Sequence, residues 1–267
     1  MSNNSANNDA LFQFNKIEMD YDPYPIGYVP QIFRPEVYAE LAQTYPALDL
    51  FAFMPKLGLK YSLSQLNNPD RYHQFIESTP AWKRVYEEVK SPQFVANVIE
   101  SLDGCKVDLG LRGRYEVINA EKDGFSRRLQ KAVSCLKKGH PGRLGIKTRF
   151  EFSVLPADGG HIRPHTDAAN KLITLVVSCI SDGEWNSAHG GGTAVLRPKD
   201  VTENYNHNNR YLEFDATETI KTFPFVPNQC VVFVKTFNSL HAVSPMSGAG
   251  STAMRKTLTI NLELDAA

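Results

Sequence analysis

The sequence predicts an α+β fold in which helices come first and a block of short strands follows. Before about residue 140, several segments repeat apolar residues at the i, i+3 and i+4 spacing of an amphipathic helix. After about residue 145, short segments alternate apolar and polar residues or are wholly apolar, and Gly, Pro, Asn and Asp fill the joints between them. Such a strand block predicts an antiparallel sandwich or barrel that carries the helices on one face.

The chain of 267 residues opens on a stretch rich in Asn and Ser, MSNNSANNDA. A stretch of this kind buries too little apolar surface to fold, so we expect a disordered N-terminal tail over residues 1–20. No repeat or low-complexity linker divides the remainder. Residues 21–267 are therefore expected to form a single domain, with helical support at about 30–140 and the strand core at about 145–264.

Three helical regions are predicted. Pro35 stands at the first turn of a helix over residues 36–45. A helical pair covers about 70–102, and its second member starts at the cap signal Ser91-Pro92. The segment FSRRLQKAVSCLKKG, residues 125–139, is a third amphipathic helix.

The strand block begins with KTRFEFSVLP, which alternates as a strand does. The next segment, KLITLVVSCI, is β-branched and almost wholly apolar, so we expect protein to cover both of its faces. The predicted strands cover residues 147–156, 171–180, 191–198, 229–235 and 255–264.

Composition argues against two classes of partner. Lys and Arg number 29, and Asp and Glu also number 29, so the chain lacks the basic excess that nucleic acids and anionic membranes favour. No apolar stretch approaches the roughly 18–20 residues that a membrane helix needs. The start shows no basic region followed by an apolar one, and the four cysteines form no CxxC pair. These features predict a cytoplasmic protein with no membrane or nucleic-acid partner.

A histidine and an aspartate, His165 and Asp167, follow the first predicted strand in RPHTDAAN. Side chains two residues apart at a strand end point the same way, so both can reach one ion. His241 lies just beyond the apolar strand QCVVFVK and supplies a third ligand. Two histidines and one carboxylate form the facial triad of non-haem Fe(II) oxygenases. The alternatives are a polar turn at 165–167 and a hydrogen-bonded loop histidine at 241.

The last predicted strand, in MRKTLTINL, carries Arg255, Thr257, Thr259 and Asn261 on one face and Lys256 on the other. An arginine followed by hydroxyls inside a barrel suits a carboxylate, because the guanidinium forks onto two oxygens and a hydroxyl adds a third bond. The alternative is an exposed arginine at a strand start followed by ordinary strand threonines.

Between residues 148 and 264 the chain resembles the Fe(II)/2-oxoglutarate-dependent dioxygenases, in the branch that includes the prolyl hydroxylases. The elements that carry the resemblance are FSVLPADGGHIRPHTD, LITLVVS, GGGTAVL, FNSLHAVSPM and RKTLTIN. A weaker likeness covers YPIGYVPQIFRPEVYAELAQTYP. The resemblance implies a double-stranded β-helix, or jelly roll, with the N-terminal helices packed on its major sheet.

The resemblance also implies roles for single residues. His165, Asp167 and His241 match the iron ligands of the family. Arg255 matches the residue that pairs with the distal carboxylate of 2-oxoglutarate, and Thr257 matches a supporting hydroxyl. The implied cofactors are Fe(II), 2-oxoglutarate as cosubstrate, and O₂.

The implied activity is a hydroxylase that oxidises an unactivated C–H bond of a small molecule or of an amino-acid or peptide residue, releasing succinate and CO₂. Halogenating relatives lack the carboxylate that Asp167 supplies, and nucleic-acid demethylases carry an arginine at the position of Asn261. Two alternatives remain: a non-oxidising jelly roll that binds metal or sugar, and a degenerate oxygenase fold that serves protein interaction.

Overall fold

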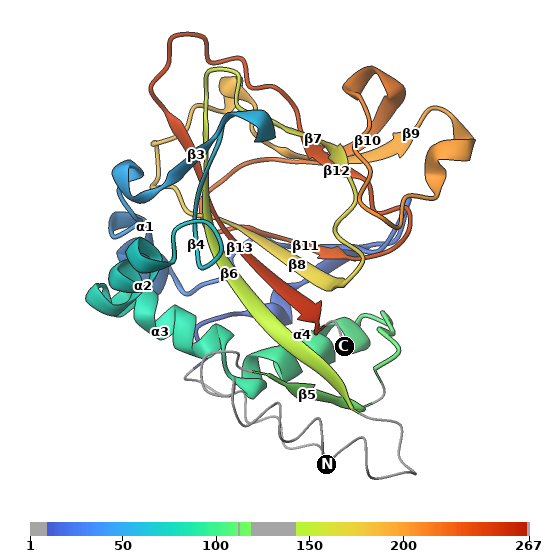
Figure 1. Cartoon of the computed structure of the whole chain (residues 1–267), viewed down its shortest axis with the longest axis horizontal. Coiled ribbons are helices and arrows are strands. Elements are labelled where there is room, and N and C mark those ends of the chain that lie inside the picture. Colours follow the sequence, from blue (N-terminus) through green and yellow to red (C-terminus); the bar gives the residue numbers. More distant parts are fainter. Residues whose placement is uncertain (1–9, 112, 119–142, 266–267) are drawn as a thin grey trace.

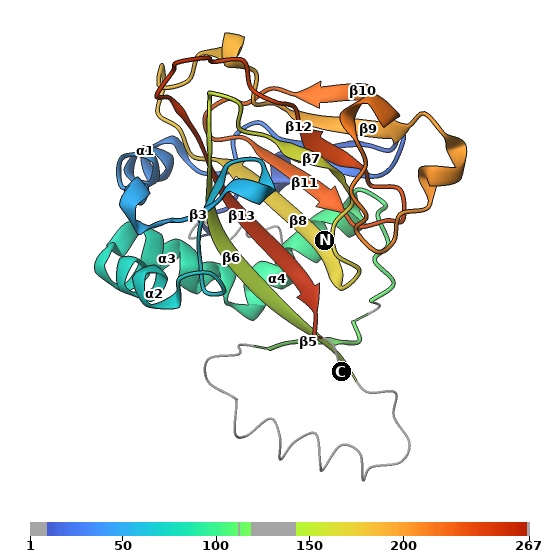
Figure 2. The ribbon, with the colours of Figure 1, turned by 45° about the horizontal axis from the view of Figure 1, so that its top comes forward.

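The computed structural model of the chain describes residues 10–111, 113–118 and 143–265. Two β-sheets face each other, and helices cover the outer side of the larger sheet (Figure 1). The view in Figure 2 shows the same three layers, with the smaller sheet on the far side of the larger one from α2, α3 and α4. None of the helices in these described ranges is long and apolar enough to span a bilayer.

Each helix in the described ranges has proline in its first turn, where the missing N–H costs nothing. The helices are α1 (Pro35–Gln43), α2 (Pro69–Ser78), α3 (Pro80–Val89) and α4 (Pro92–Gly104). The predicted helix over 36–45 is confirmed as α1. The pair predicted over 70–102 is confirmed as α3 and α4, the second of which starts after Ser91 as predicted, but the region also holds a third helix, α2, which ends where Pro80 starts α3. The helix predicted over 125–139 lies outside the described residues.

The larger sheet has nine strands in the order β1-β2-β11-β8-β13-β6-β4-β3, with β5 paired to β6. Its strands are β1 (Glu18–Asp20), β2 (Ile26–Val29), β3 (Ala52–Met54), β4 (Lys60–Ser64), β5 (Tyr115–Val117), β6 (Leu144–Pro156), β8 (Lys171–Ser178), β11 (Cys230–Val234) and β13 (Met254–Leu264). The smaller sheet has the order β10-β9-β12-β7. Its strands are β7 (Ile162–His165), β9 (Thr193–Pro198), β10 (Thr217–Phe223) and β12 (His241–Val243).

From β6 to β13 the chain moves back and forth between the two sheets. It passes from the larger sheet to the smaller between β6 and β7, returns at β8, and repeats the crossing at β9, β11, β12 and β13. All pairings among these strands are antiparallel. This strand order is that of a double-stranded β-helix, so the predicted fold class, with helices on the major sheet, is confirmed.

Alternation along β13 separates the hydrophobic core from the space between the sheets. Leu258, Ile260 and Leu262 are fully buried in the core, which continues under the helices to Trp82. The intervening residues of β13 point between the sheets. The larger sheet therefore has one apolar face that the helices cover and one polar face that lines the interior of the barrel.

The expectation of a disordered tail over residues 1–20 is wrong for residues 10–20. Phe12 and Phe14 are each only 6% exposed, and both rings lie against Phe94 of α4. Residues 18–20 form β1, which pairs with β2. These aromatic anchors bury enough apolar surface to hold the segment in place. Residues 1–9 lie outside the described residues, and the assignment of residues 21–267 to one domain stays a prediction.

Candidate metal centre

Three potential metal ligands meet where β7 and β12 pair in the smaller sheet. His165 and His241 are register partners, and their ring centroids lie 4.5 Å apart. The ligand atoms of His165, Asp167 and His241 all lie within 4.8 Å of one another. The structure thus brings together the three side chains that the sequence pattern singles out. Among the described residues, no other group of three or more His, Cys, Asp or Glu side chains has this spacing.

Backbone carbonyls fix the tautomer of both histidines. The Nδ1 atom of His165 lies 2.8 Å from the carbonyl oxygen of Arg163, and the Nδ1 atom of His241 lies 2.9 Å from that of Ser239. A carbonyl only accepts, so Nδ1 carries the proton and Nε2 keeps a free lone pair. Burial lowers the pKa of His165 to about 3 and lowers the pKa of His241 as well. Both rings are therefore neutral, which is the form that binds metals.

The Asp167 carboxylate is held from two sides. Lys171 donates to Oδ1 at 2.6 Å and Thr174 donates to Oδ2 at 2.7 Å. Burial would raise the pKa of Asp167, but the Lys171 ammonium holds it below its ordinary value. Two neutral imidazoles and an ionised carboxylate make up the donor set of a divalent transition metal such as Fe(II). The residues present therefore fit the metal.

A cavity of about 160 Å³ extends from these ligands between the two sheets, and we call it the metal cavity. Val176, Phe233 and Leu155 supply apolar wall. Thr257, Thr259 and Asn261 line it from β13.

Arg255 lines the same cavity and is only 4% exposed. Its Nε donates to the carbonyl oxygen of Gly191 at 2.6 Å, and its guanidinium carbon lies 4.5 Å from the centre of the Phe225 ring. Burial lowers the pKa of Arg255 to about 10, which leaves it charged at neutral pH. Within the described ranges no carboxylate forms an ion pair with it. A buried cation without an anion is costly, so this end of the cavity fits a carboxylate ligand.

The alternation predicted for β13 is confirmed at Lys256, which lies on the opposite face. Its ammonium pairs with Glu184 and lies 5.8 Å from the centre of the Tyr45 ring. The Thr257 hydroxyl donates to the carbonyl oxygen of Ser153 at 3.3 Å while it lines the cavity. The position of Lys256 leaves Arg255 as the cation on the cavity side of this strand.

Several polar residues of the cavity wall were not predicted from the sequence. Lys171 and Thr174 contact Asp167, and Lys60 donates to Glu151 at 2.6 Å. Asp167 and Lys171 are four residues apart, but they flank a turn before β8 and not a helix, so this spacing does not predict the contact. The place of Lys60 was not readable, because it depends on the pairing of β4 with β6, far apart in the sequence.

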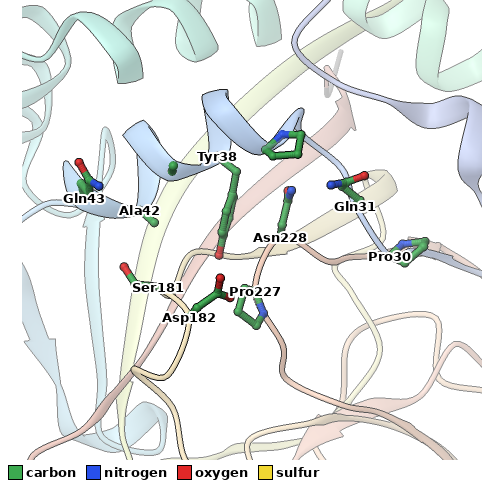
Figure 3. Close-up of a pocket in the computed structure, with 11 residues that line it drawn as sticks. Pro30, Gln31, Tyr38, Ala42, Gln43, Ser181, Asp182, Pro227 and Asn228 are labelled. Carbon is green, nitrogen blue, oxygen red and sulfur yellow. The ribbon is translucent and has the colours of Figure 1, made fainter.

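A larger pocket of about 420 Å³ lies elsewhere, between α1 and the loops that follow β8 and precede β11. Figure 3 shows Tyr38 of α1 across from Asp182 and Pro227 in this pocket. Of the described residues that line this pocket, only Asp182 is charged, and the pocket shares no lining residue with the metal cavity. It therefore holds no cluster of groups suited to catalysis.

Comparison with known proteins gives no matching family model and no matching curated protein. Among solved structures, the chain is similar to the α-ketoglutarate-dependent epimerase SnoN of nogalamycin biosynthesis, with 13% identity, 89% of this chain and 78% of that chain covered, and a TM-score of 0.47. It is also similar to a Pseudomonas putida prolyl-4-hydroxylase, with 16% identity, 56% and 70% covered, and a TM-score of 0.29. A third is an oxygenase from Shewanella oneidensis, with 13% identity, 90% and 81% covered, and a TM-score of 0.42. The similarity is weak in sequence and in structure, so the fold assignment rests on the strand order itself.

Proposed function

We propose that this protein is an Fe(II)- and 2-oxoglutarate-dependent oxygenase that hydroxylates a C–H bond of a small molecule or an amino-acid residue. One observation carries the proposal. A triad of two neutral imidazoles and a carboxylate shares a cavity with a buried arginine that has no carboxylate partner among the described residues. The triad accounts for the metal, and the arginine accounts for a cosubstrate with a free carboxylate at its far end.

In this proposal His165, Asp167 and His241 would hold the ferrous ion. The chemistry supplied there is oxidative decarboxylation, in which 2-oxoglutarate and O₂ give succinate and CO₂, with one oxygen atom in succinate and the other in the hydroxylated product. Hydrogen bonds of the two histidine Nδ1 atoms to backbone carbonyls, and of Thr174 to Asp167, orient the three side chains toward the metal position.

Arg255 binds and orients the distal carboxylate of 2-oxoglutarate, and the Thr257 hydroxyl adds a hydrogen bond. Phe225 packs on the guanidinium, and the Gly191 carbonyl oxygen accepts a hydrogen bond from Nε. The guanidinium is therefore oriented before the ligand binds. Arg255 is only 4% exposed, and its burial strengthens this charge-assisted contact.

The test is to add Fe(II) and 2-oxoglutarate to the protein without oxygen. We expect a weak visible charge-transfer band if 2-oxoglutarate binds the metal that His165, Asp167 and His241 would hold. Admission of O₂ with a panel of candidate substrates should then release succinate, with a gain of one oxygen atom in one of them. Folded protein that binds metal but gives neither the band nor succinate would instead be a non-oxidising binding module.

Replacing Lys171 by methionine is expected to tighten divalent metal binding by about tenfold. The Lys171 ammonium lies 2.6 Å from Asp167 Oδ1, so it repels a dication at that carboxylate. The same substitution should lower the thermal stability of the metal-free protein, because Asp167 loses a buried ion-pair partner.

Metal titration calorimetry on the wild type, Lys171→Met and Lys171→Arg measures this effect. The arginine variant keeps the charge and serves as the matched control. Weaker metal binding by Lys171→Met would show that Lys171 positions the carboxylate and does not compete with the ion.

A further inference from the structure

A second pocket, of about 160 Å³, adjoins the metal cavity and shares Lys60, Ile162 and His165 with it. We call it the mouth pocket. Because His165 is one of the proposed metal ligands, a molecule that fills this pocket lies beside the metal. The mouth pocket is therefore placed to hold the part of a substrate that is not itself oxidised.

The charges that line the mouth pocket are all of one sign. Lys56, Lys60 and Arg163 are its cations, and no carboxylate of the described residues lines it. Lys60 donates to Glu151 on the metal-cavity side, and Arg163 pairs with Glu213, whose side chain is 69% exposed. An ion pair so open to solvent is weak and can yield to a ligand.

Lys56 is exposed and forms no ion pair among the residues that the structure describes. It belongs to a short 3-10 turn, Pro55–Leu57, at the tip of the β3–β4 hairpin. The pocket thus offers one uncompensated cation and one that is only loosely paired. Two such cations with no carboxylate in the lining raise the local concentration of anions.

The backbone holds this hairpin tip over the metal ligands. The His161 N–H donates to the carbonyl oxygen of Gly58 at 3.0 Å. Gly58 has φ of 72°, and a Cβ there would stand 2.0 Å from the His161 carbonyl oxygen. Only glycine allows both the left-handed turn and this close approach, so Lys56 and Leu57 are fixed beside the strand that leads to His165.

The remaining walls are aromatic and aliphatic. The Tyr211 ring lies 5.7 Å from the His165 ring, and the guanidinium of Arg163 lies 5.4 Å from the centre of the Tyr211 ring. Leu57 and Ile162 complete the apolar lining. An apolar body fits against these side chains while an acidic group reaches the cations.

We propose that the mouth pocket selects a small-molecule substrate that carries a carboxylate or phosphate next to an apolar body. Lys56 and Arg163 bind the anionic group, and Tyr211 with Leu57 packs on the body. This inference rests on the proposed oxygenase function in one respect, namely that the bound molecule is the substrate of the enzyme. The binding itself depends only on the pocket.

The test is a binding comparison by saturation-transfer NMR, with the 267-residue chain both metal-free and loaded with Zn(II) and 2-oxoglutarate, so that no turnover occurs. The probes are matched pairs: 4-phenylbutyrate against 4-phenylbutyramide, and phenyl phosphate against phenol. We expect the acids to bind about tenfold more tightly than their neutral partners. The carboxylate and phosphate arms show which acid the pocket prefers.

The double variant Lys56→Gln/Arg163→Gln should bring each acid to parity with its neutral partner, and Lys56→Glu should reverse the preference. Lys199→Gln, an exposed lysine away from both cavities, is the matched control and should leave the preference unchanged. In the protein loaded with Zn(II) and 2-oxoglutarate, where the cosubstrate occupies Arg255, no acid preference in the wild type, or a preference that persists in the double variant, overturns the proposal. Failure of the oxygenase function would show separately, as absence of the charge-transfer band and of succinate.

Discussion

Replacing His241 by alanine is expected to abolish succinate formation and to weaken divalent metal binding on the order of 100-fold or more. The variant keeps only His165 and Asp167, and two ligands do not hold a divalent ion in an open site. The His241 ring also stacks on Phe233 at a centroid distance of 4.0 Å, so alanine leaves a small void. We expect that void to cost about 1–3 kcal/mol, which the fold survives.

Metal titration measures the loss directly, and circular dichroism checks that the variant is folded. His207→Ala is the matched control, because His207 is exposed and lines neither cavity. Wild-type metal affinity and succinate release in the folded His241→Ala protein would remove this residue from the ligand set.

The metal-ligand cluster was predictable because its signals are local. His165 and Asp167 stand two apart at a strand end, and His241 stands just past a wholly apolar strand. In a barrel of antiparallel strands, polar residues at such ends converge. The side-chain alternation of β13 was readable for the same reason, since the period of two persists over the whole strand.

The smaller sheet was less predictable, because its strands carry weak local signals. β12 has only three residues, β7 contains a proline, and β10, an edge strand, is mostly polar and exposed. Pairing partners from distant parts of the chain decide that these segments are strands. Of this sheet, only β9 was predicted.

Contacts between distant segments were hidden for the same reason. The contact of Lys60 with Glu151 follows from the β4–β6 register, and the presence of Lys56 and Arg163 in one pocket follows from the close approach of Gly58 to His161. Neither arrangement leaves a pattern in the sequence. Side chains that complete a site from a separate hairpin are found only once the backbone is in place.

Replacing Arg255 by methionine is expected to raise the apparent KM for 2-oxoglutarate by about 100-fold, since loss of roughly 3 kcal/mol of charge-assisted hydrogen bonding corresponds to two decades. Methionine fills much of the volume of the arginine side chain, but it loses the guanidinium contact with Phe225 and cannot bind a carboxylate. Lys256→Gln is the matched control, because the neighbouring side chain points to the other face and pairs with Glu184. Its KM for 2-oxoglutarate should stay at the wild-type value.

The same variant separates a ligand-binding arginine from a structural one by its effect on stability. Without 2-oxoglutarate, Arg255 is a buried cation with no carboxylate partner among the described residues, so Arg255→Met should leave the Tm of the protein unchanged or raise it. Adding 2-oxoglutarate should raise the Tm of the wild type, because a ligand stabilises the folded state that binds it. The Tm of the variant should not change, because the variant does not bind the ligand. A large loss of Tm in the ligand-free variant, together with an unchanged KM, would mean that the guanidinium serves the fold through Gly191 and Phe225 and that 2-oxoglutarate is held elsewhere.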